Sequence, residues 1–285
     1  MDHVNLNFIL GAKKAGTTFL ADMLNQHPEI QVPREKEPRI FMVPNPEEID
    51  RLVRRHFDGS LRQICVDASV GYSVLAERRA GGQLSPVGNP LPIPTRIHAR
   101  FPGAKLIFLL RDPIDRLYSD YVHDNRSKGD MPVFEDWVEL HPEAILRSRY
   151  NIQIRRYLEY FDLSQFMFVS FQTLVTEPLL TARQVSTFLG VRDTDFCFDI
   201  AANKNEGVVL NEAGALIASI LGSKRMDDAI SAVRATFPAF LKDALKAKLS
   251  YKPAKPVDLP REKYARLFRA DMEDVHELTG LEFLI

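Results

Sequence analysis

A glycine-bounded segment near the start of the chain has the residue types and spacing of a phosphate site. A short apolar run ends at Gly11, a second glycine follows at Gly16, and an apolar-periodic segment begins at Thr17. This pattern predicts a buried strand, a loop and then a helix. Such a loop turns successive backbone N–H groups toward one point, and the helix start adds partial positive charge. Lys14 lies inside the loop, so we expect its ammonium group to reach the same anion.

The position of the lysine separates this loop from that of the nucleotide triphosphatases. Their loop reads G-x-x-x-x-G-K-[ST], with the lysine directly after the second glycine. Here that position is Thr17, and Lys14 lies two residues before Gly16. A P-loop kinase that uses ATP or GTP needs the missing lysine, so the sequence disfavours it. A plain strand-to-helix turn with a solvated lysine is the other alternative.

A second candidate group follows another apolar run. Residues 105–110 are apolar on both faces, as a central strand of a parallel sheet must be, and the run ends at Arg111. Asp112 can cap a following helix, and Pro113 fits the first turn of that helix.

Arg111 and the hydroxyl of Ser119 could together hold a phosphate. Ser119 lies eight residues after Arg111, two helical turns along much the same face. Ligands of open parallel sheets bind at the carboxyl ends of the strands, so Arg111 and Lys14 should face one crevice. An arginine fork and a hydroxyl that converge suit this anion. Alternatively, Arg111 pairs with Asp112 or Asp115, and Ser119 faces water.

The elements that must position these residues alternate over the first 190 residues. Besides the two apolar runs, we expect strands at 30–32, 63–67 and 166–171, and helices at 44–57, 93–101, 113–126, 133–140, 142–160 and 177–189, the last closed by Gly190. This order predicts an α/β fold of three layers, P-loop-like, with a central parallel sheet flanked by helices. We expect one domain over 1–285, an α/β core at 1–205 with a helical extension at 206–285 packed on it. The last helix should cover 261–279.

Three stretches lack a regular pattern. Residues 33–41 hold two charged runs around prolines, which ordinarily form a solvated loop. Residues 79–95 hold three glycines and four prolines, a density that forbids regular structure and predicts a loop at the mouth of the site. Residues 199–207 are polar and turn-like.

The composition points to no polyanionic partner. The net charge is −1, so no chain-wide basic field favours a nucleic acid or an anionic membrane. The two cysteines, Cys65 and Cys197, fit neither a metal spacing nor a disulfide framework. The chain shows no basic leader segment and no apolar run long enough to span a bilayer. We therefore expect a cytoplasmic protein.

Taken together, these segments resemble the sulfotransferases that use 3′-phosphoadenosine 5′-phosphosulfate (PAPS). The loop G-x-x-K-x-G-T-T at 11–18 is similar to their 5′-phosphosulfate loop, and residues 106–121 resemble their 3′-phosphate segment. Lys36-Glu37-Pro38-Arg39-Ile40-Phe41 resembles the K-E-x-x-F-F segment of the heparan-sulfate-type and bacterial members. The likeness covers residues 6–205 and is weak beyond them.

The resemblance implies transfer of a sulfuryl group from PAPS to a hydroxyl of a small-molecule or carbohydrate acceptor, which leaves 3′-phosphoadenosine 5′-phosphate (PAP). Lys14 would stabilise charge on the bridging oxygen, and Glu37 would be the general base. Arg111 and Ser119 would hold the 3′-phosphate. The 5′-phosphate would lie against the backbone N–H groups and hydroxyls of the loop, at Ala15, Gly16, Thr17 and Thr18. Sulfuryl carries less charge than phosphoryl, and the sequence has no Asp/His cluster, so we expect no metal.

The sequence departs from the family in two places. Asp67-Ala68-Ser69-Val70-Gly71-Tyr72 stands where heparan-sulfate-type members have E-K-S-P-x-Y, so Ala68 replaces a lysine that would orient the acceptor. The cofactor-closing K-G-R-x-H loop is absent, and Asn203-Lys204-Asn205 is its only counterpart. Another alternative is an inactive nucleotide-binding module that has kept the fold and lost catalysis. If Glu37 is only a surface charge, Asp67 or a histidine such as His123 is the alternative base.

Overall fold

The computed structural model describes residues 4–35, 37–57, 63–74, 92–128, 132–191, 209–210, 250–251 and 259–283. Contacts divide the chain into two compact units. The first unit contains Met1–Leu117, His141–Asn203 and Arg261–Ile285, and the second contains Tyr118–Leu140 and Lys204–Pro260. The central sheet lies in the first unit. The single domain with a boundary at residue 205 stays a prediction.

Five parallel strands form the central sheet in the order β2-β3-β1-β4-β5. Their bounds are Leu6–Gly11 for β1, Ile30–Gln31 for β2, Ile64–Asp67 for β3, Leu106–Leu110 for β4 and Phe166–Ser170 for β5. β1, β3 and β4 are buried along their whole length, as strands covered on both faces are. The predicted α/β fold with a central parallel sheet is confirmed.

The register brings the carboxyl ends of three neighbouring strands to one edge. Phe8 of β1 pairs with Asp67, the last residue of β3, and with Leu106 of β4. Because the strands are parallel, the segments that follow Gly11, Asp67 and Leu110 all leave the sheet at this edge. Ligands of such sheets bind at this edge.

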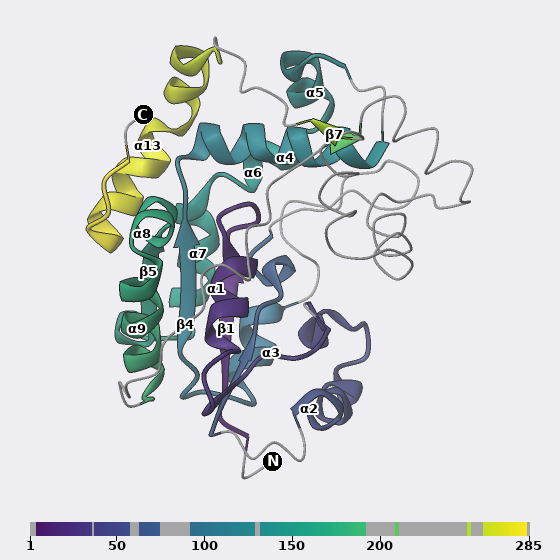
Figure 1. Ribbon diagram of the computed structural model, residues 1–285, viewed down its shortest axis with the longest axis vertical. Helices are drawn as coiled ribbons and strands as arrows, with labels where there is room; N and C mark the ends of the chain where they lie inside the picture. Colours follow the sequence, from purple (N-terminus) through teal and green to yellow (C-terminus); the bar gives the residue numbers. More distant parts are fainter. Residues whose placement is uncertain are drawn as a thin grey trace. The chain divides into compact units, whose positions relative to one another are not determined.

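Helices follow the strands in the predicted order (Figure 1). They are α1 Thr17–Leu24, α2 Ile49–Phe57, α3 Ile93–His98, α4 Pro113–Lys128, α5 Phe134–Leu140, α9 Pro178–Leu189 and α13 Arg261–Thr279. α1 and α9 pack against each other, with Met23 against Ala182, and against β1 and β5 respectively. Gly190 ends α9 with a φ of 95°, which confirms the predicted glycine cap.

The single helix predicted at 142–160 is wrong, because the chain forms two helices there. They are α6 Pro142–Leu146 and α7 Tyr150–Leu158. The fully buried side chain of Arg116 enters the break, where Nη2 donates to the carbonyl oxygen of Ala144 at 2.6 Å and Nε donates to Ser148 Oγ at 2.6 Å. Ser148 Oγ in turn donates to the carbonyl oxygen of Pro113 at 3.0 Å. Tertiary hydrogen bonds therefore replace the helical ones.

Other differences from the predicted elements are smaller. The helix expected at 44–57 is a 3₁₀ turn, η2 Pro46–Glu48, followed by α2. The strand expected to reach Phe171 ends at Ser170, and an unpredicted helix, α8 Phe171–Thr176, follows. Two further 3₁₀ turns, η1 Ile40–Met42 and η3 Val70–Tyr72, also were not predicted. The remaining elements are η4 Leu163–Gln165 and an antiparallel pair, β6 Val209–Leu210 with β7 Ser250–Tyr251.

The predicted final helix is confirmed, since α13 spans Arg261–Thr279. Residues 79–91 of the predicted loop lie outside the described residues. The last residues of that loop, 93–95, instead begin α3. The turn at 199–207 and the other helices predicted beyond 205 also lie outside the described residues. Among the helices in the described ranges, none is both long and apolar enough to cross a membrane. The cytoplasmic location stays a prediction.

Candidate active site

The loop between β1 and α1 has the backbone of an anion cradle. Lys14 and Gly16 both have positive φ values, 71° and 87°, so two residues of the loop adopt the left-handed conformation. No side chain caps the start of α1, which leaves the first-turn N–H groups at Thr17 and Thr18 without an intrahelical acceptor. An anion at this position would supply the missing acceptors.

Gly16 is required here for space as well as for its backbone conformation. A Cβ atom at this residue would lie 3.0 Å from Leu174 Cδ2 and 3.2 Å from Phe171 Cδ2, both on α8. The loop thus packs closely against α8, and a Cβ atom here would require the side chains of Leu174 and Phe171 to shift by a few tenths of an ångström, in addition to the strain of the positive φ. The second glycine of the motif therefore allows the close packing that sets the position of the loop.

Arg111 leaves the end of β4 and reaches the same loop. Its Nη1 donates to the carbonyl oxygen of Lys14 at 3.0 Å, and its guanidinium lies over the ring of Phe171 at 4.4 Å from the centroid. Its Nε is buried and has no hydrogen-bond partner in the described part of the chain. A buried donor without an acceptor costs about 1–3 kcal/mol, so this atom can still take a hydrogen-bond partner.

Burial also lowers the pKa of Arg111, and the nearby charge of Asp115 opposes this shift. Because guanidinium starts from a pKa above about 12, it stays charged at neutral pH. Arg111 is therefore a partly desolvated cation at the edge of the sheet, where its attraction for an anion is stronger than in water.

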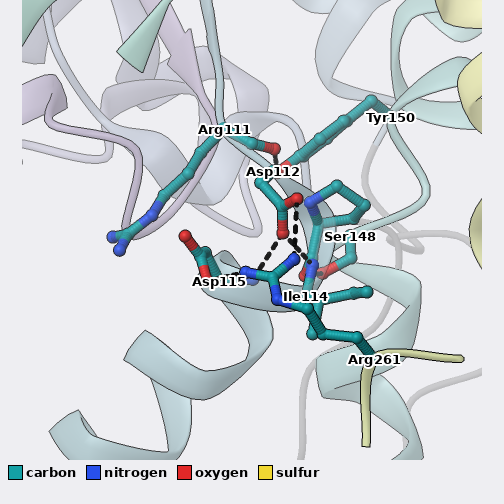
Figure 2. A network of polar contacts seen from close by, with 8 residues as sticks. Arg111, Asp112, Ile114, Asp115, Ser148, Tyr150 and Arg261 are labelled. Atoms are coloured by element: carbon teal, nitrogen blue, oxygen red, sulfur yellow. Dashed lines mark hydrogen bonds and ion pairs between the residues drawn. The ribbon is translucent and has the colours of Figure 1, made fainter. Parts of the chain in front are cut away.

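The residues after Arg111 form the polar network of Figure 2. Asp112 Oδ1 accepts from the backbone N–H groups of Ile114 and Asp115 at 2.9 and 2.8 Å, which confirms the predicted helix cap. Arg261, the first residue of α13, bridges both carboxylates, at 3.3 Å to Asp112 Oδ2 and 2.7 Å to Asp115 Oδ1. Figure 2 shows the side chain of Arg111 extending away from this group.

A buried tyrosine also holds the backbone of Arg111. The buried hydroxyl of Tyr150 donates to the Arg111 carbonyl oxygen at 2.9 Å. Burial raises the pKa of this tyrosine far above its ordinary value, so it remains a donor. The carbonyl oxygen of Arg111 is thus hydrogen-bonded to Tyr150, and the carboxylates of Asp112 and Asp115 are paired with Arg261. Neither Tyr150 nor Arg261 was found from the sequence.

Ser119 lies on α4 and is half-buried. It belongs to the second compact unit, whereas Arg111 belongs to the first. Its approach to Arg111 stays a prediction. His123, an alternative base, lies on the same helix and is exposed.

Glu37 lies in a segment that is fixed at two backbone positions. The Arg39 N–H donates to Ser69 Oγ at 3.0 Å, and the Phe41 N–H donates to the Tyr72 hydroxyl oxygen at 3.2 Å. Arg39 has a φ of 51°, and its Nη2 lies 3.3 Å from Glu37 Oε2. The charged stretch is therefore tied to the end of β3.

Asp67 accepts hydrogen bonds on both carboxylate oxygens. Its Oδ1 accepts from the Ser69 hydroxyl at 2.6 Å and from the Ser69 N–H at 3.0 Å, and its Oδ2 accepts from the Tyr72 hydroxyl at 2.7 Å. The side chain is fully buried, and this burial raises its pKa to about 6 despite the hydrogen bonds. A carboxylate with both oxygens engaged is poorly placed to receive a proton from a substrate.

The phosphate loop and the Glu37 segment both adjoin η3. A Cβ atom at Gly11 would lie 2.5 Å from Ser73 Oγ, so the end of β1 touches this turn. The rings of Phe8 and Phe41 meet edge to face at 5.4 Å between centroids, and Tyr72 lies against both rings. The end of β1 and the segment that carries Glu37 thus both contact the residues that follow β3. An anion cradle together with a carboxylate suits the transfer of an anionic group to an acceptor that loses a proton.

Comparisons with known proteins agree with this chemistry. A family model described as a sulfotransferase domain matches residues 6–201. Human heparan sulfate glucosamine 3-O-sulfotransferase 6 is 29% identical over 197 residues, which cover 65% of this chain and 52% of that protein. Mouse heparan sulfate glucosamine 3-O-sulfotransferase 3B1 is 29% identical over 198 residues, which cover 65% of this chain and 45% of that protein. The chain thus spans about half the length of these relatives.

One solved structure matches along nearly the whole chain. It is a sulfotransferase from Alicyclobacillus acidocaldarius, with a TM-score of 0.65 and 22% identity, and the match covers 99% of this chain and 98% of that one. At this identity the likeness concerns the fold.

Proposed function

The chain belongs to the sulfotransferase family, and from this premise we propose that it transfers the sulfuryl group of PAPS to a hydroxyl of a small-molecule or carbohydrate acceptor. The observation that carries the proposal is the buried Nε of Arg111, which has no acceptor in the described residues although the guanidinium is bonded to the phosphate loop. A donor of this kind fits a second phosphate group beside the one that the loop would hold. PAPS has two such groups, at its 3′ and 5′ positions.

When bound, PAPS supplies the sulfuryl group, and PAP departs with the negative charge. In such in-line transfers the protein contributes positioning and charge stabilisation. Lys14 would stabilise charge on the departing oxygen. The backbone N–H groups at Gly16, Thr17 and Thr18 would hold the 5′-phosphate, with the two threonine hydroxyls. The Ala15 N–H would join them only by giving up its 3.0 Å hydrogen bond to the carbonyl oxygen of Ala12. Arg111 and Ser119 would hold the 3′-phosphate.

Glu37 would take the proton of the acceptor hydroxyl. Arg39 supports this role, because the ion pair between their side chains limits the directions that the Glu37 carboxylate can take. Asp67 is a weaker candidate, since it is fully buried and both of its oxygens accept hydrogen bonds from Ser69 and Tyr72. No metal enters this proposal.

For the acceptor we propose a hydroxylated small molecule or a sugar. The named relatives act on heparan sulfate glucosamine. In this chain Ala68 occupies the position where the resemblance implies an acceptor-orienting lysine, and its side chain is buried. The chain therefore lacks one cation that a polyanionic acceptor would use.

Calorimetry in excess EDTA tests the donor site. PAP should bind clearly more tightly than ADP, because only PAP carries the 3′-phosphate. Arg111→Ala should weaken PAP binding by about 2–4 kcal/mol and ADP binding by less, since ADP would lose only the support that Arg111 gives to the loop at Lys14. Equal affinity of the wild type for PAP and ADP would remove the 3′-phosphate assignment.

Turnover distinguishes an enzyme from an inactive module. Labelled PAPS is incubated with a panel of phenols, primary alcohols and amino sugars, and the transferred label is counted. We expect label on at least one acceptor, and a faster release of PAP than in the absence of protein. Tight PAP binding with neither activity would instead support an inactive nucleotide-binding module.

A further inference from the structure

Two buried hydroxyl groups connect Asp67 to the segment that carries Glu37. The Ser69 hydroxyl donates to Asp67 Oδ1 and accepts from the Arg39 N–H. The Tyr72 hydroxyl donates to Asp67 Oδ2 and accepts from the Phe41 N–H. Two parallel connections therefore run from one carboxylate to two backbone positions of one segment.

The direction of each hydrogen bond follows from the groups involved. An ionised carboxylate only accepts, and a backbone N–H only donates, so each hydroxyl hydrogen must point toward Asp67. Its lone pairs then face the N–H groups of Arg39 and Phe41. Burial, with the adjacent charge of Asp67, raises the pKa of Tyr72 well above its ordinary value, which keeps this hydroxyl a donor. Asp67 thus sets the orientation of both hydroxyls.

Arg39, one of the two residues held in this way, has an unusual backbone conformation. Arg39 has a φ of 51°, a conformation that non-glycine residues adopt rarely and that needs support from surrounding contacts. With its N–H held by Ser69 in this conformation, the Arg39 side chain turns back to within 3.3 Å of Glu37 Oε2. This ion pair links the Glu37 carboxylate to the local geometry at Arg39.

We propose that Asp67, Ser69 and Tyr72 are positioning residues for Glu37, with Asp67 orienting the two hydroxyls that fix the Glu37 segment. The link to catalysis rests on the proposed role of Glu37 as the base. The anchoring of the segment does not depend on that role. The competing explanation is a buried polar network that stabilises the fold and has no effect on the placement of Glu37.

Amide hydrogen exchange tests the anchoring without any activity measurement. Ser69→Ala should speed exchange at the Arg39 N–H, and Tyr72→Phe at the Phe41 N–H, each on the order of tenfold, the value expected for one lost hydrogen bond. Tyr157→Phe is the matched control. It removes another buried tyrosine hydroxyl, one that donates to the Tyr72 carbonyl oxygen at 2.9 Å and has no hydrogen bond to the segment. Exchange at Arg39 and Phe41 should be unchanged in this control.

Kinetics test the link to Glu37. The probe is the best acceptor of the panel described above, or PAPS hydrolysis by water if no acceptor is used. Ser69→Ala and Tyr72→Phe should each lower kcat about tenfold while the dissociation constant of PAP changes less than about twofold. Tyr157→Phe should keep kcat even where its thermal midpoint falls by the same amount. In a Glu37→Gln background, Tyr72→Phe should cause no further loss, because both changes act through one carboxylate.

Each measurement can overturn a separate part of the inference. Unchanged exchange at both amides in the hydroxyl-free variants would refute the anchoring. A kcat loss that follows thermal stability in all three variants, or that multiplies with Glu37→Gln, would refute positioning and leave only a structural role. Full turnover in Glu37→Gln alone would instead reject the proposed base, and the exchange result would still decide whether the hydroxyls of Ser69 and Tyr72 anchor the segment.

Discussion

At the scale of single residues, the candidate site combines buried polar groups with an unusual backbone. Within the described ranges Arg111 Nε is buried without a hydrogen-bond partner, Asp67 is fully buried, and Lys14 and Arg39 have positive φ values. Strain and unsatisfied groups of this kind concentrate at functional sites, where the surrounding structure holds them in place. Each one is a point at which a substitution should change function or pH dependence in a specific way.

Substitutions at Glu37 and Lys14 should separate chemistry from binding. Glu37→Gln keeps the size of the side chain and cannot take a proton, so turnover should fall by about 10²–10⁴-fold while PAP affinity stays nearly unchanged. Lys14→Ala should lower both turnover and PAP affinity, because the lysine side chain would contact the phosphate before and during transfer. Steady-state kinetics and calorimetry measure the two effects. Near-normal turnover in Glu37→Gln would end the case for this base.

Asp67 should make stability depend on pH in a predictable direction. Its pKa is raised from 3.8 to about 6 by burial, so the folded state binds this proton more tightly than the unfolded state does. The contribution to the free energy of unfolding is present in full below about pH 4 and is lost as the pH rises through about 6. The loss should approach 3 kcal/mol, since one pKa unit corresponds to about 1.4 kcal/mol. Urea unfolding of wild type and Asp67→Asn at several pH values measures it.

The quantity to follow with pH is the difference in the free energy of unfolding between wild type and Asp67→Asn. Asp271 also has a pKa raised to about 6 by burial, and it remains in both proteins, so it cancels. Asp67→Asn also disturbs the hydrogen bonds to Ser69 and Tyr72, which adds an offset that varies little with pH. If the free energies of unfolding of wild type and Asp67→Asn run parallel between about pH 4 and 6, the raised pKa of Asp67 is contradicted.

At the scale of elements, the site depends on a helix that is distant in the sequence. α13 packs on α7, where Asn151 bonds to Asp271 and Asp274. Its first residue, Arg261, holds the carboxylates of Asp112 and Asp115 at the start of α4. This contact neutralises two negative charges close to Arg111.

Arg261→Ala should therefore weaken PAP binding although Arg261 is not expected to touch the ligand. Without it, the two carboxylates would repel the 3′-phosphate and compete for Arg111. We expect a loss of affinity of about 3–10-fold that shrinks as salt rises, because Arg261 is half-exposed and its ion pairs are screened. Arg266→Ala, an exposed arginine on the same helix, is the matched control for charge. Equal losses of PAP affinity in Arg261→Ala and Arg266→Ala would rule out a specific role for Arg261.

At the scale of the whole molecule, the unit that contains the sheet is assembled from separate parts of the chain. Met1–Leu117, His141–Asn203 and Arg261–Ile285 form one compact unit, so α13 belongs with the sheet in space although a long segment separates them in sequence. Phe268 of α13 is fully buried in this unit. The stability of the sheet unit should therefore depend on its last helix.

Phe268→Ala should lower the free energy of unfolding by about 3–5 kcal/mol, the usual effect of removing a buried aromatic ring. Leu267→Ala changes the neighbouring, 37%-exposed residue and should stay within about 0.5 kcal/mol of wild type. Urea unfolding followed by circular dichroism measures both variants. A small effect at Phe268 would mean that α13 adds little to the stability of the unit.

The sequence by itself determined the local elements and the phosphate loop. Apolar runs at Leu6–Gly11 and Leu106–Leu110 must be buried strands, and the glycines around Lys14 must form a turn, because these preferences are set within a few residues of chain. The helix cap at Asp112 and the bounds of α13 follow from the same local rules. The end of the second apolar run made Arg111 a candidate, and family resemblance then added Glu37.

Only the tertiary structure decided which distant groups support those candidates. The break between α6 and α7 arises because Arg116, from another helix, takes over the carbonyl oxygen of Ala144. The hydroxyls of Ser69 and Tyr72 meet the Glu37 segment because β3 lies beside β2, the strand that precedes this segment. Such contacts depend on strand order and on long-range packing, and hydrophobic periodicity within one segment carries no information about either.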